Sequence, residues 1–82
     1  MLQLTLYTTS GCHLCEEAEE MLNLLQNQQI CRWVAVEISE DDFLVDRYGV
    51  RIPVIATEGG RELGWPFTAV ALNDWLIQDV SG

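Results

Sequence analysis

Cys12 and Cys15 are two thiols separated by two residues, and their types and spacing point to chemistry more directly than any others in this 82-residue sequence. Such a pair can alternate between a dithiol and a disulfide, and its thiolate form attacks other disulfides. On a helix, residues three apart lie one turn from each other, within the ~4.4–6.8 Å between Cα atoms that a disulfide tolerates. The spacing therefore indicates redox chemistry if a helix carries the pair.

The residues around the pair predict that helix. Leucines alternate with Gln, Thr and Tyr over residues 2–7, which predicts a strand, and residues 8–11 break it. Residues 12–28 contain no Gly or Pro and carry an apolar stripe at helical spacing. Because the free N–H groups and the dipole of a helix N-terminus stabilise an anion, we expect Cys12 to be the nucleophile. Cys15 begins the apolar stripe and is predicted to be the shielded, resolving thiol.

Charges near the pair act in both directions. Four glutamates lie within residues 16–20, and nearby negative charge disfavours a thiolate. Exposed carboxylates are screened over ~8–10 Å at ordinary ionic strength, so we expect only partial cancellation of the helix effect. His13 would favour the thiolate when protonated, and an exposed bystander is an equally good interpretation of this residue.

Two other interpretations of the pair stay open. Half of a zinc site would need two further ligands, and Cys31 and His13 are not spaced as a second pair. The other is a purely structural pair, which the position between a strand and a helix disfavours. Cys31 itself is predicted to be a small, inert apolar residue, since nothing near it in the sequence completes a pair.

Strand and helix signals alternate along the chain without repeats or linkers, which predicts a single domain over residues 1–82. After the first helix, the predicted elements are a strand at 33–38, a helix at 40–48, a strand within 50–57, a strand at 61–64 and a helix at 69–78. The strand–helix–strand start implies a parallel pair, and Gly59-Gly60 implies an antiparallel hairpin. The predicted fold class is therefore α/β, with the order β-α-β-α-β-β-α and a mixed four-stranded sheet flanked by three helices.

The composition limits the partners. Thirteen acidic residues against four arginines give a net charge of −9. We therefore expect neither nucleic acid nor an acidic membrane surface as a partner, because both require a basic surface. No apolar run approaches the ~20 residues of a membrane span, and no signal-peptide pattern opens the sequence, so we expect a cytoplasmic protein. Three cysteines are too few for a secreted disulfide scaffold, which also favours a reducing compartment.

Three segments carry a family resemblance. They are Leu4-Thr-Leu-Tyr-Thr-Thr-Ser-Gly-Cys-His-Leu-Cys15, Tyr48-Gly-Val-Arg-Ile-Pro-Val54 and Gly64-Trp-Pro-Phe67. Through them the sequence resembles the glutaredoxin-like branch of the thioredoxin superfamily, and in particular a group of small bacterial glutaredoxin-like proteins. The resemblance implies a thioredoxin fold over nearly the whole chain. It also implies that Pro53 follows a cis peptide bond beside the thiol pair, and that the backbone of Ile52 pairs with an incoming peptide.

The resemblance also places other side chains near the pair. It brings Arg51 close enough to steady a thiolate or a ligand carboxylate, and an ion pair with a local acid is the alternative for this arginine. Trp65 and Phe67 would either line the site or pack in the core, and we favour the core. The candidate substrate-binding residues are therefore His13, Arg51, Ile52 and Pro53.

This sequence departs from dithiol glutaredoxins between the cysteines, where His13 and Leu14 replace a proline and an aromatic residue. It contains no lysine, and residues 64–68 replace the Gly-Gly-Asp-type segment that binds glutathione in that family. We expect a monomeric thiol–disulfide oxidoreductase without a built-in cofactor, acting on a protein or small-molecule disulfide. Glutathione or a thioredoxin-type reductant would be the co-substrate. The alternative is a non-catalytic binding module, or a protein that holds an iron–sulfur cluster or another metal.

Overall fold

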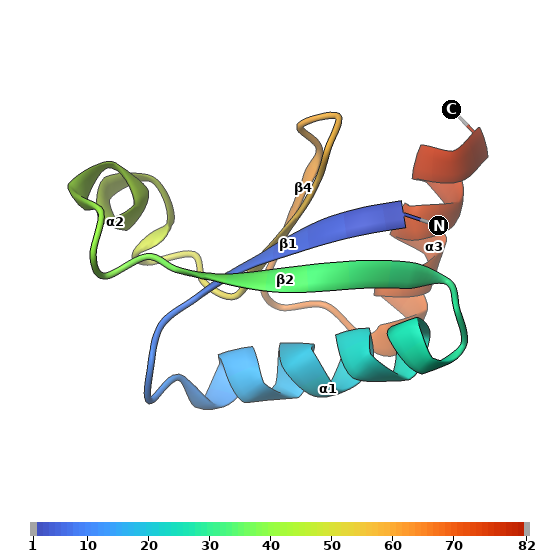
Figure 1. Ribbon diagram of the computed structural model, residues 1–82, viewed down its shortest axis with the longest axis horizontal. Helices are drawn as coiled ribbons and strands as arrows, with labels where there is room; N and C mark the ends of the chain where they lie inside the picture. The colour runs from blue at the N-terminus through green and yellow to red at the C-terminus, as the bar shows by residue number, and fades with distance from the viewer. Residues whose placement is uncertain (1, 82) are drawn as a thin grey trace.

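The alternating leucines belong to β1, Leu2–Thr8, which lies inside the sheet of the computed structural model (Figure 1). The structure describes the backbone of residues 2–81 and the side chains of residues 2–78. β1 pairs in parallel with β2, Cys31–Glu37, and antiparallel with β3, Val54–Thr57. β4, Glu62–Gly64, pairs antiparallel with β3, so the strand order is β2-β1-β3-β4. The predicted mixed four-stranded sheet is confirmed.

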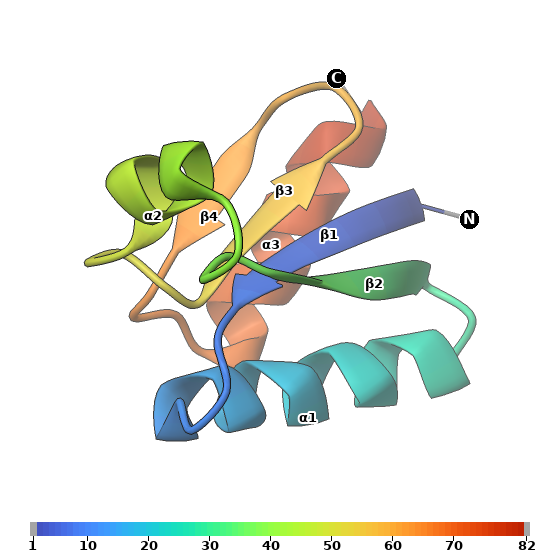
Figure 2. The same cartoon turned by 60° about the vertical axis from the view of Figure 1, so that its left-hand side comes forward.

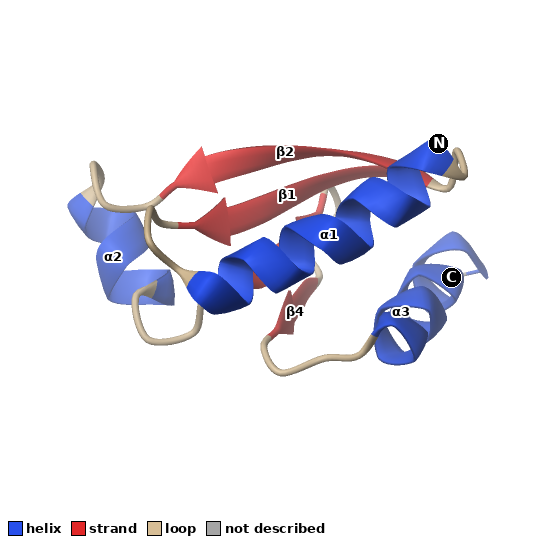
Figure 3. Cartoon of the chain, turned by 90° about the horizontal axis from the view of Figure 1, so that it is seen from below, coloured by secondary structure: helices blue, strands red, loops and turns tan. Residues whose placement is uncertain are grey.

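Two helices cover one face of this sheet, and the third packs against the other. α1, His13–Asn27, and α3, Ala69–Ser81, contribute to the core cluster that contains the leucines of β1. α2, Asp42–Tyr48, instead contributes Tyr48 to a second cluster. Figure 3 shows α1 alongside β1 and β2, with α2 beyond the ends of these two strands. The element order β-α-β-α-β-β-α and the α/β class are as predicted.

The larger core cluster lies between the sheet and the pair α1 and α3. Its buried side chains are Leu4, Leu6, Ala18, Leu22, Cys31, Ile55, Phe67, Leu72 and Leu76. Full burial of one large aliphatic or aromatic side chain contributes ~1.5–3 kcal/mol. Trp65 packs against this cluster and meets Phe67 edge to face, with 5.0 Å between the ring centroids. Both aromatic residues therefore serve the core, as predicted.

Tyr48, the last residue of α2, holds the second cluster together. Its ring stacks on Tyr7 of β1, with centroids 4.1 Å apart and planes inclined by 14°. Ile38 and Val54 are buried in the same cluster. The cluster fixes α2 at the end of β1 from which the chain continues to Cys12, so it supports the region of the candidate site.

Several predicted boundaries were wrong by a few residues. β2 begins two residues before the predicted start, at Cys31. β3, Val54–Thr57, lies within the predicted range 50–57 and begins directly after Pro53. α2 begins at Asp42 because the carboxylate of Asp41 accepts the N–H of Phe43 at 2.9 Å and so caps the helix there.

The outer edge of β2 is bonded to α1. The backbone N–H of Trp33 donates to Oε1 of Gln26 at 3.2 Å, and its indole Nε1 donates to Oδ1 of Asn23 at the same distance. Side chains of the helix therefore contact a backbone group that the strand order leaves unpaired on that side.

Candidate active site

Cys12 and Cys15 lie at the start of α1 and are joined by a disulfide, with 5.2 Å between their Cα atoms. Cys12 is the N-cap of the helix, in an extended backbone conformation, and its Sγ accepts the N–H of Cys15 at 3.1 Å. The carbonyl oxygen of Cys12 accepts the N–H of Glu16 at 3.2 Å, which closes the first turn. The predicted placement of the pair at a helix N-terminus is confirmed.

The two sulfur-bearing residues differ in exposure. Cys12 is half-buried, whereas Cys15 is 2% exposed and faces the core together with Ala18 and Leu22. A substrate can therefore reach Cys12 more readily than Cys15. This is the difference in exposure that the sequence predicts for the two residues.

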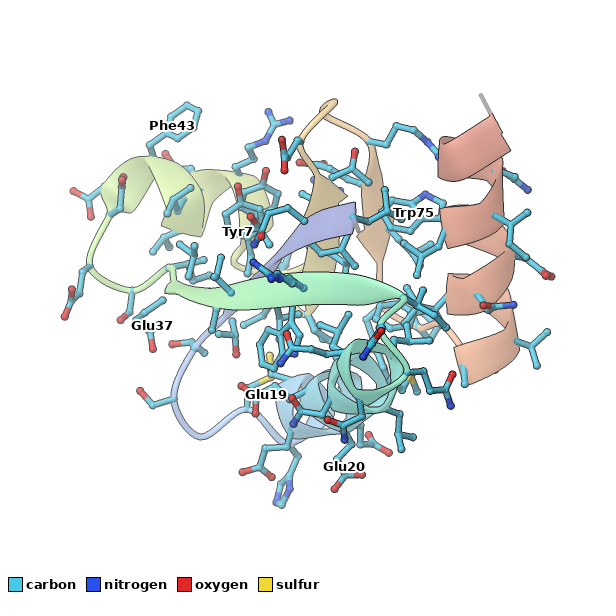
Figure 4. The ribbon with its side chains drawn as sticks, turned by 45° about the vertical axis from the view of Figure 1, so that its right-hand side comes forward. Tyr7, Glu19, Glu20, Glu37, Phe43 and Trp75 are labelled. Carbon is cyan, nitrogen blue, oxygen red and sulfur yellow. A yellow bond between two sulfur atoms is a disulfide. The ribbon has the colours of Figure 1, made fainter. Side chains whose placement is uncertain are left out.

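The loop before Cys12 is held by Glu37, the last residue of β2. Glu37 Oε1 accepts the backbone N–H of Ser10 at 3.0 Å, and Oε2 accepts the backbone N–H of Ser39 at 3.1 Å. A hydrogen bond from the Thr9 side chain, followed by that from Ser39, lowers the pKa of Glu37 to about 2. The ionised carboxylate therefore ties the loop to the sheet. Figure 4 shows Glu37 near the end of β2.

Sequence reasoning missed Glu37, although the parallel register contains the signal. Thr8 at the end of β1 pairs with Glu37, so the first residues after β1 must lie beside this carboxylate. Once β1 and β2 are assumed to be parallel neighbours, a hydrogen-bonding side chain at the end of β2 becomes a candidate anchor for the loop after β1. The exact register, which the sequence does not state, selects Glu37 rather than a neighbour.

A small pocket of about 160 Å³ lies beside the disulfide. It is lined by the loop at 8–11, by Cys12 and Cys15, and by Glu16 and Glu19 of α1. A larger hollow of about 370 Å³ lies over β2 and includes none of these residues. The pocket at the cysteines is therefore the one that the candidate chemistry would use.

The proline segment lies at the same end of the sheet as the cysteines. Tyr7 of β1 pairs with Val54 at the start of β3, so the turn before β3 lies where β1 ends (Figure 2). The Ile52–Pro53 peptide bond is cis, as the resemblance implied, and Pro53 is buried. The Trp65–Pro66 bond is also cis, which the sequence analysis did not anticipate.

The expectation for the backbone of Ile52 needs a correction. Its N–H donates to the carbonyl oxygen of Tyr48 at 3.0 Å, because the chain turns back at the end of α2, so this donor is already used. The carbonyl oxygen of Pro53 likewise accepts the N–H of Trp65 at 3.1 Å. Within residues 2–81 the structure shows no hydrogen bond to the carbonyl oxygen of Ile52, which is the backbone group left for an incoming peptide.

Arg51 is held by Glu62 of β4 rather than by a group of the disulfide site. Its Nη2 lies 3.2 Å from Oε1 of Glu62, and its guanidinium lies 5.6 Å from the centroid of the Tyr48 ring. Arg47 pairs with the other oxygen of Glu62 at 3.6 Å, and the Tyr48 hydroxyl also donates to that carboxylate. This arrangement is an ion pair with a local acid, the alternative predicted for Arg51.

The protonation of this network follows from its contacts. The hydrogen bond from Tyr48, followed by the hydrogen bond from Arg51 and the positive charges of Arg47 and Arg51, lowers the pKa of Glu62. Burial, followed by the hydrogen bond to Glu62, raises the pKa of Tyr48. Both shifts favour an ionised Glu62 and a protonated Tyr48 hydroxyl. Sequence reasoning did not single out Glu62, because its partners come from α2 and from the turn after it.

His13 and Cys31 lie in opposite environments. The imidazole of His13 is 97% exposed, and its Nδ1 lies 3.5 Å from a carboxylate oxygen of Glu16. Cys31 is fully buried in the larger core cluster, and burial raises the pKa of its thiol. Cys31 is therefore the small, buried residue that the sequence predicts, and His13 lies at the surface beside Cys12.

Neither a metal cluster nor a membrane span is found in the part of the chain that the structure describes. Within that part, no three His, Cys, Asp or Glu side chains gather closely enough to hold a metal ion. None of the helices there combines the length and apolar character needed to cross a membrane.

Comparisons with known proteins agree with the geometry. The family model of the Glutaredoxin-like domain (DUF836) matches residues 3–77. The crystal structure of protein XcR50 from X. campestris is 41% identical, with a TM-score of 0.81 over 92% of this chain and 96% of that one. Protein Ne2328 from Nitrosomonas europaea is 26% identical, with a TM-score of 0.76 over 90% and 89% of the two chains.

A more distant structural neighbour confirms the predicted thioredoxin fold. A mutant thioredoxin from Halobacterium salinarum NRC-1 is 22% identical, with a TM-score of 0.72 over 94% of this chain and 73% of that one. At this level of identity the likeness concerns the arrangement of strands and helices.

Proposed function

Since the chain belongs to the glutaredoxin-like domain family, we propose that it is a thiol–disulfide oxidoreductase whose Cys12–Cys15 pair exchanges with the disulfide of a substrate. One observation carries the proposal. Cys12 caps the N-terminus of α1 and is partly accessible, whereas Cys15 is buried within bonding distance of it. That arrangement supplies an attacking sulfur and an inner sulfur that can displace the product.

The first step uses the reduced pair. The N–H groups that open α1, including that of Cys15, lie where they stabilise a thiolate on Cys12. The Cys12 thiolate attacks one substrate sulfur, so a Cys12–substrate disulfide forms and the substrate disulfide breaks. The leaving sulfur takes a proton from water. The buried Cys15 does not compete for the substrate at this stage.

The second step releases the product. Cys15 loses a proton and attacks Sγ of Cys12, so the internal disulfide forms and the second substrate sulfur leaves as a thiolate that becomes protonated. The substrate gains two electrons from the pair and two protons from water, and water receives the proton that Cys15 loses. An external thiol, either glutathione or a thioredoxin-type dithiol, then reduces the internal disulfide by the same two exchanges in reverse. The protein requires no built-in cofactor for this cycle.

The turn before β3 is the proposed binding edge for a peptide substrate. The free carbonyl oxygen of Ile52 accepts one backbone N–H of the substrate, and buried Pro53 fixes the position of that carbonyl. His13 lies at the surface beside Cys12 and contacts the part of the substrate that leaves. Arg51 directly precedes Ile52 and acts indirectly. Its ion pair with Glu62 holds this part of the turn in place. The protein acts as a monomer in the cytoplasm.

The alkylation rate of Cys12 against pH tests this proposal. The assay uses the Cys15→Ser variant, in which Cys12 is the accessible thiol, with an unstructured cysteine peptide as reference. A thiolate stabilised by the helix gives a midpoint below the ~8.5 of free cysteine. A midpoint equal to that of the reference peptide contradicts the proposal, because the helix then gives the thiol no advantage.

A further inference from the structure

Acidic side chains line the pocket that contains the sulfur a substrate must reach. Glu16 and Glu19 line the pocket beside the disulfide, and Figure 4 shows Glu19 on α1. A third carboxylate, that of Glu37, holds Ser10, which lines the same pocket. The pocket therefore has acidic side chains on α1 and behind the loop before Cys12.

The arginines of the chain do not offset this charge. Arg47 and Arg51, on either side of the end of α2, both pair with Glu62, whose side chain is only 18% exposed. Arg61 lies over the Trp75 ring, 5.0 Å from its centroid. Arg32 lies near the start of β2, at the opposite end of the sheet from Cys12. The four arginines of the sequence are thus engaged or distant.

We propose that this pocket selects disulfides that carry positive charge close to the sulfur atoms, such as those in basic peptides, over anionic ones such as glutathione disulfide. The inference rests on the proposed function, since it concerns the substrate of the same exchange. The physical reason is Coulombic, because carboxylates that line the pocket of the reacting sulfur attract a cationic substrate and repel an anionic one. The two carboxylates that line the pocket determine the sign of this preference. His13, whose Nδ1 lies 3.5 Å from Glu16, is the neighbouring side chain that would reduce the preference when it is protonated.

Three aliphatic disulfides, each with two methylene groups between the sulfur and the end group, separate the effect of charge from the effect of shape. Cystamine carries two ammonium groups, bis(2-hydroxyethyl) disulfide is neutral, and 3,3′-dithiodipropionate carries two carboxylates. The measurement is the second-order rate constant for oxidation of the reduced wild-type chain by an excess of each compound. In every case Cys12 forms a mixed disulfide, one small thiol leaves, Cys15 closes the internal disulfide and the second small thiol leaves.

Any thiolate is negative and itself favours a cationic disulfide, so the decisive quantity is the change in this preference between variants. The test variant Glu16→Gln/Glu19→Gln removes the two carboxylates that line the pocket. The matched control, Glu58→Gln/Asp74→Asn, removes two exposed carboxylates on the β3–β4 turn and on α3. The ratio of the cystamine rate to the dithiodipropionate rate within one variant is independent of how much thiolate that variant contains.

At ~0.01 M ionic strength, where screening extends over ~30 Å, we expect the pocket variant to lower this ratio roughly three- to tenfold. The control should change it by less than about twofold. The difference between wild type and pocket variant should shrink to less than about twofold at ~1 M salt, where the screening length is ~3 Å. The rate with the neutral disulfide should follow only the thiolate content.

The outcomes separate this inference from the proposed function. If the pocket variant keeps the wild-type ratio, or if the control lowers it equally, the carboxylates of the pocket do not select the substrate and the inference is wrong. In both cases oxidation through Cys12 still occurs and the proposed function stands. If none of the three disulfides oxidises the pair at a rate that Cys12→Ser abolishes, the proposed function itself fails.

Discussion

The carboxylate of Glu37 accepts the backbone N–H of Ser10 at 3.0 Å, across 27 positions of sequence. This bond joins the end of β2 to the loop that leads into Cys12. The loop position thus depends on an ionised side chain, and the stability of the region depends on its charge.

Acid should weaken this anchor. The pKa of Glu37 is lowered to about 2, below the ~4.3 of an unstructured glutamate. A lowered pKa means that the contribution to stability is present above about pH 4 and is lost as the pH falls toward 2. We expect Glu37→Gln to reduce the fall in urea midpoint between pH 5 and pH 2.5, relative to wild type. Glu40→Gln, which removes an exposed carboxylate close by, is the control and should keep the wild-type dependence.

The Tyr48–Glu62 contact should appear as energetic coupling. Tyr48→Phe keeps the ring that stacks on Tyr7 and removes the hydroxyl that donates to Glu62. Each of Tyr48→Phe and Glu62→Gln should lower the free energy of unfolding by about 1–3 kcal/mol. The double variant should lose less than the sum of the two, by at least ~0.5 kcal/mol. Strictly additive losses in urea unfolding would show that the two side chains act independently.

The three thiols should differ in reactivity once the disulfide is reduced. Cys12 should react first with iodoacetamide in the native protein, because it is partly accessible at the helix start. Cys31 should react only under denaturing conditions, since it is fully buried and burial raises its pKa. Peptide mapping by mass spectrometry identifies the labelled residue. Native labelling of Cys31 at the rate of Cys12 would contradict the described core.

Removal of Cys15 should trap the reaction halfway. In Cys15→Ser no internal thiol can displace the substrate, so Cys12 should retain it as a mixed disulfide that an added thiol releases. Intact-mass measurement after addition of cystamine detects the adduct. Cys12→Ser is the comparison, and it should accumulate the adduct much more slowly because its remaining thiol of the pair is buried.

The core of α1 offers a matched stability test. Leu22 is fully buried between the helix and the sheet, whereas Leu24 on the same helix is 61% exposed. Leu22→Ala should lower the free energy of unfolding by about 2–5 kcal/mol because it leaves a cavity. Leu24→Ala should change it by less than ~0.5 kcal/mol. Equal losses in chemical denaturation would mean that the exposed leucine is buried in solution.

Much of the fold was predictable because local signals agree with the tertiary structure. The alternating leucines define β1, and the long run without Gly or Pro defines α1. The predicted start of the last helix at residue 69 is confirmed, and Oγ1 of Thr68 accepts the N–H of Ala71 at 3.0 Å there. Local propensity, spacing and capping suffice where each points to the same element.

The polar anchors were not predictable by these means. Glu37 and Glu62 find partners on other elements, and these pairings depend on strand register and on the path of the turn after α2. The backbone of Ile52 was expected to pair with an incoming peptide, but the turn back to Tyr48 already uses its N–H. Such contacts form between segments that are far apart in the sequence, and a local sequence pattern does not predict which distant side chains will meet.

The hydrogen bond from Trp33 to Gln26 at the outer edge of β2 affects how two copies of the chain can associate at high protein concentration. A second molecule that tried to extend the sheet at this margin would first have to displace that glutamine amide. An ordinary helix side chain therefore disfavours strand addition between copies at the N–H of Trp33.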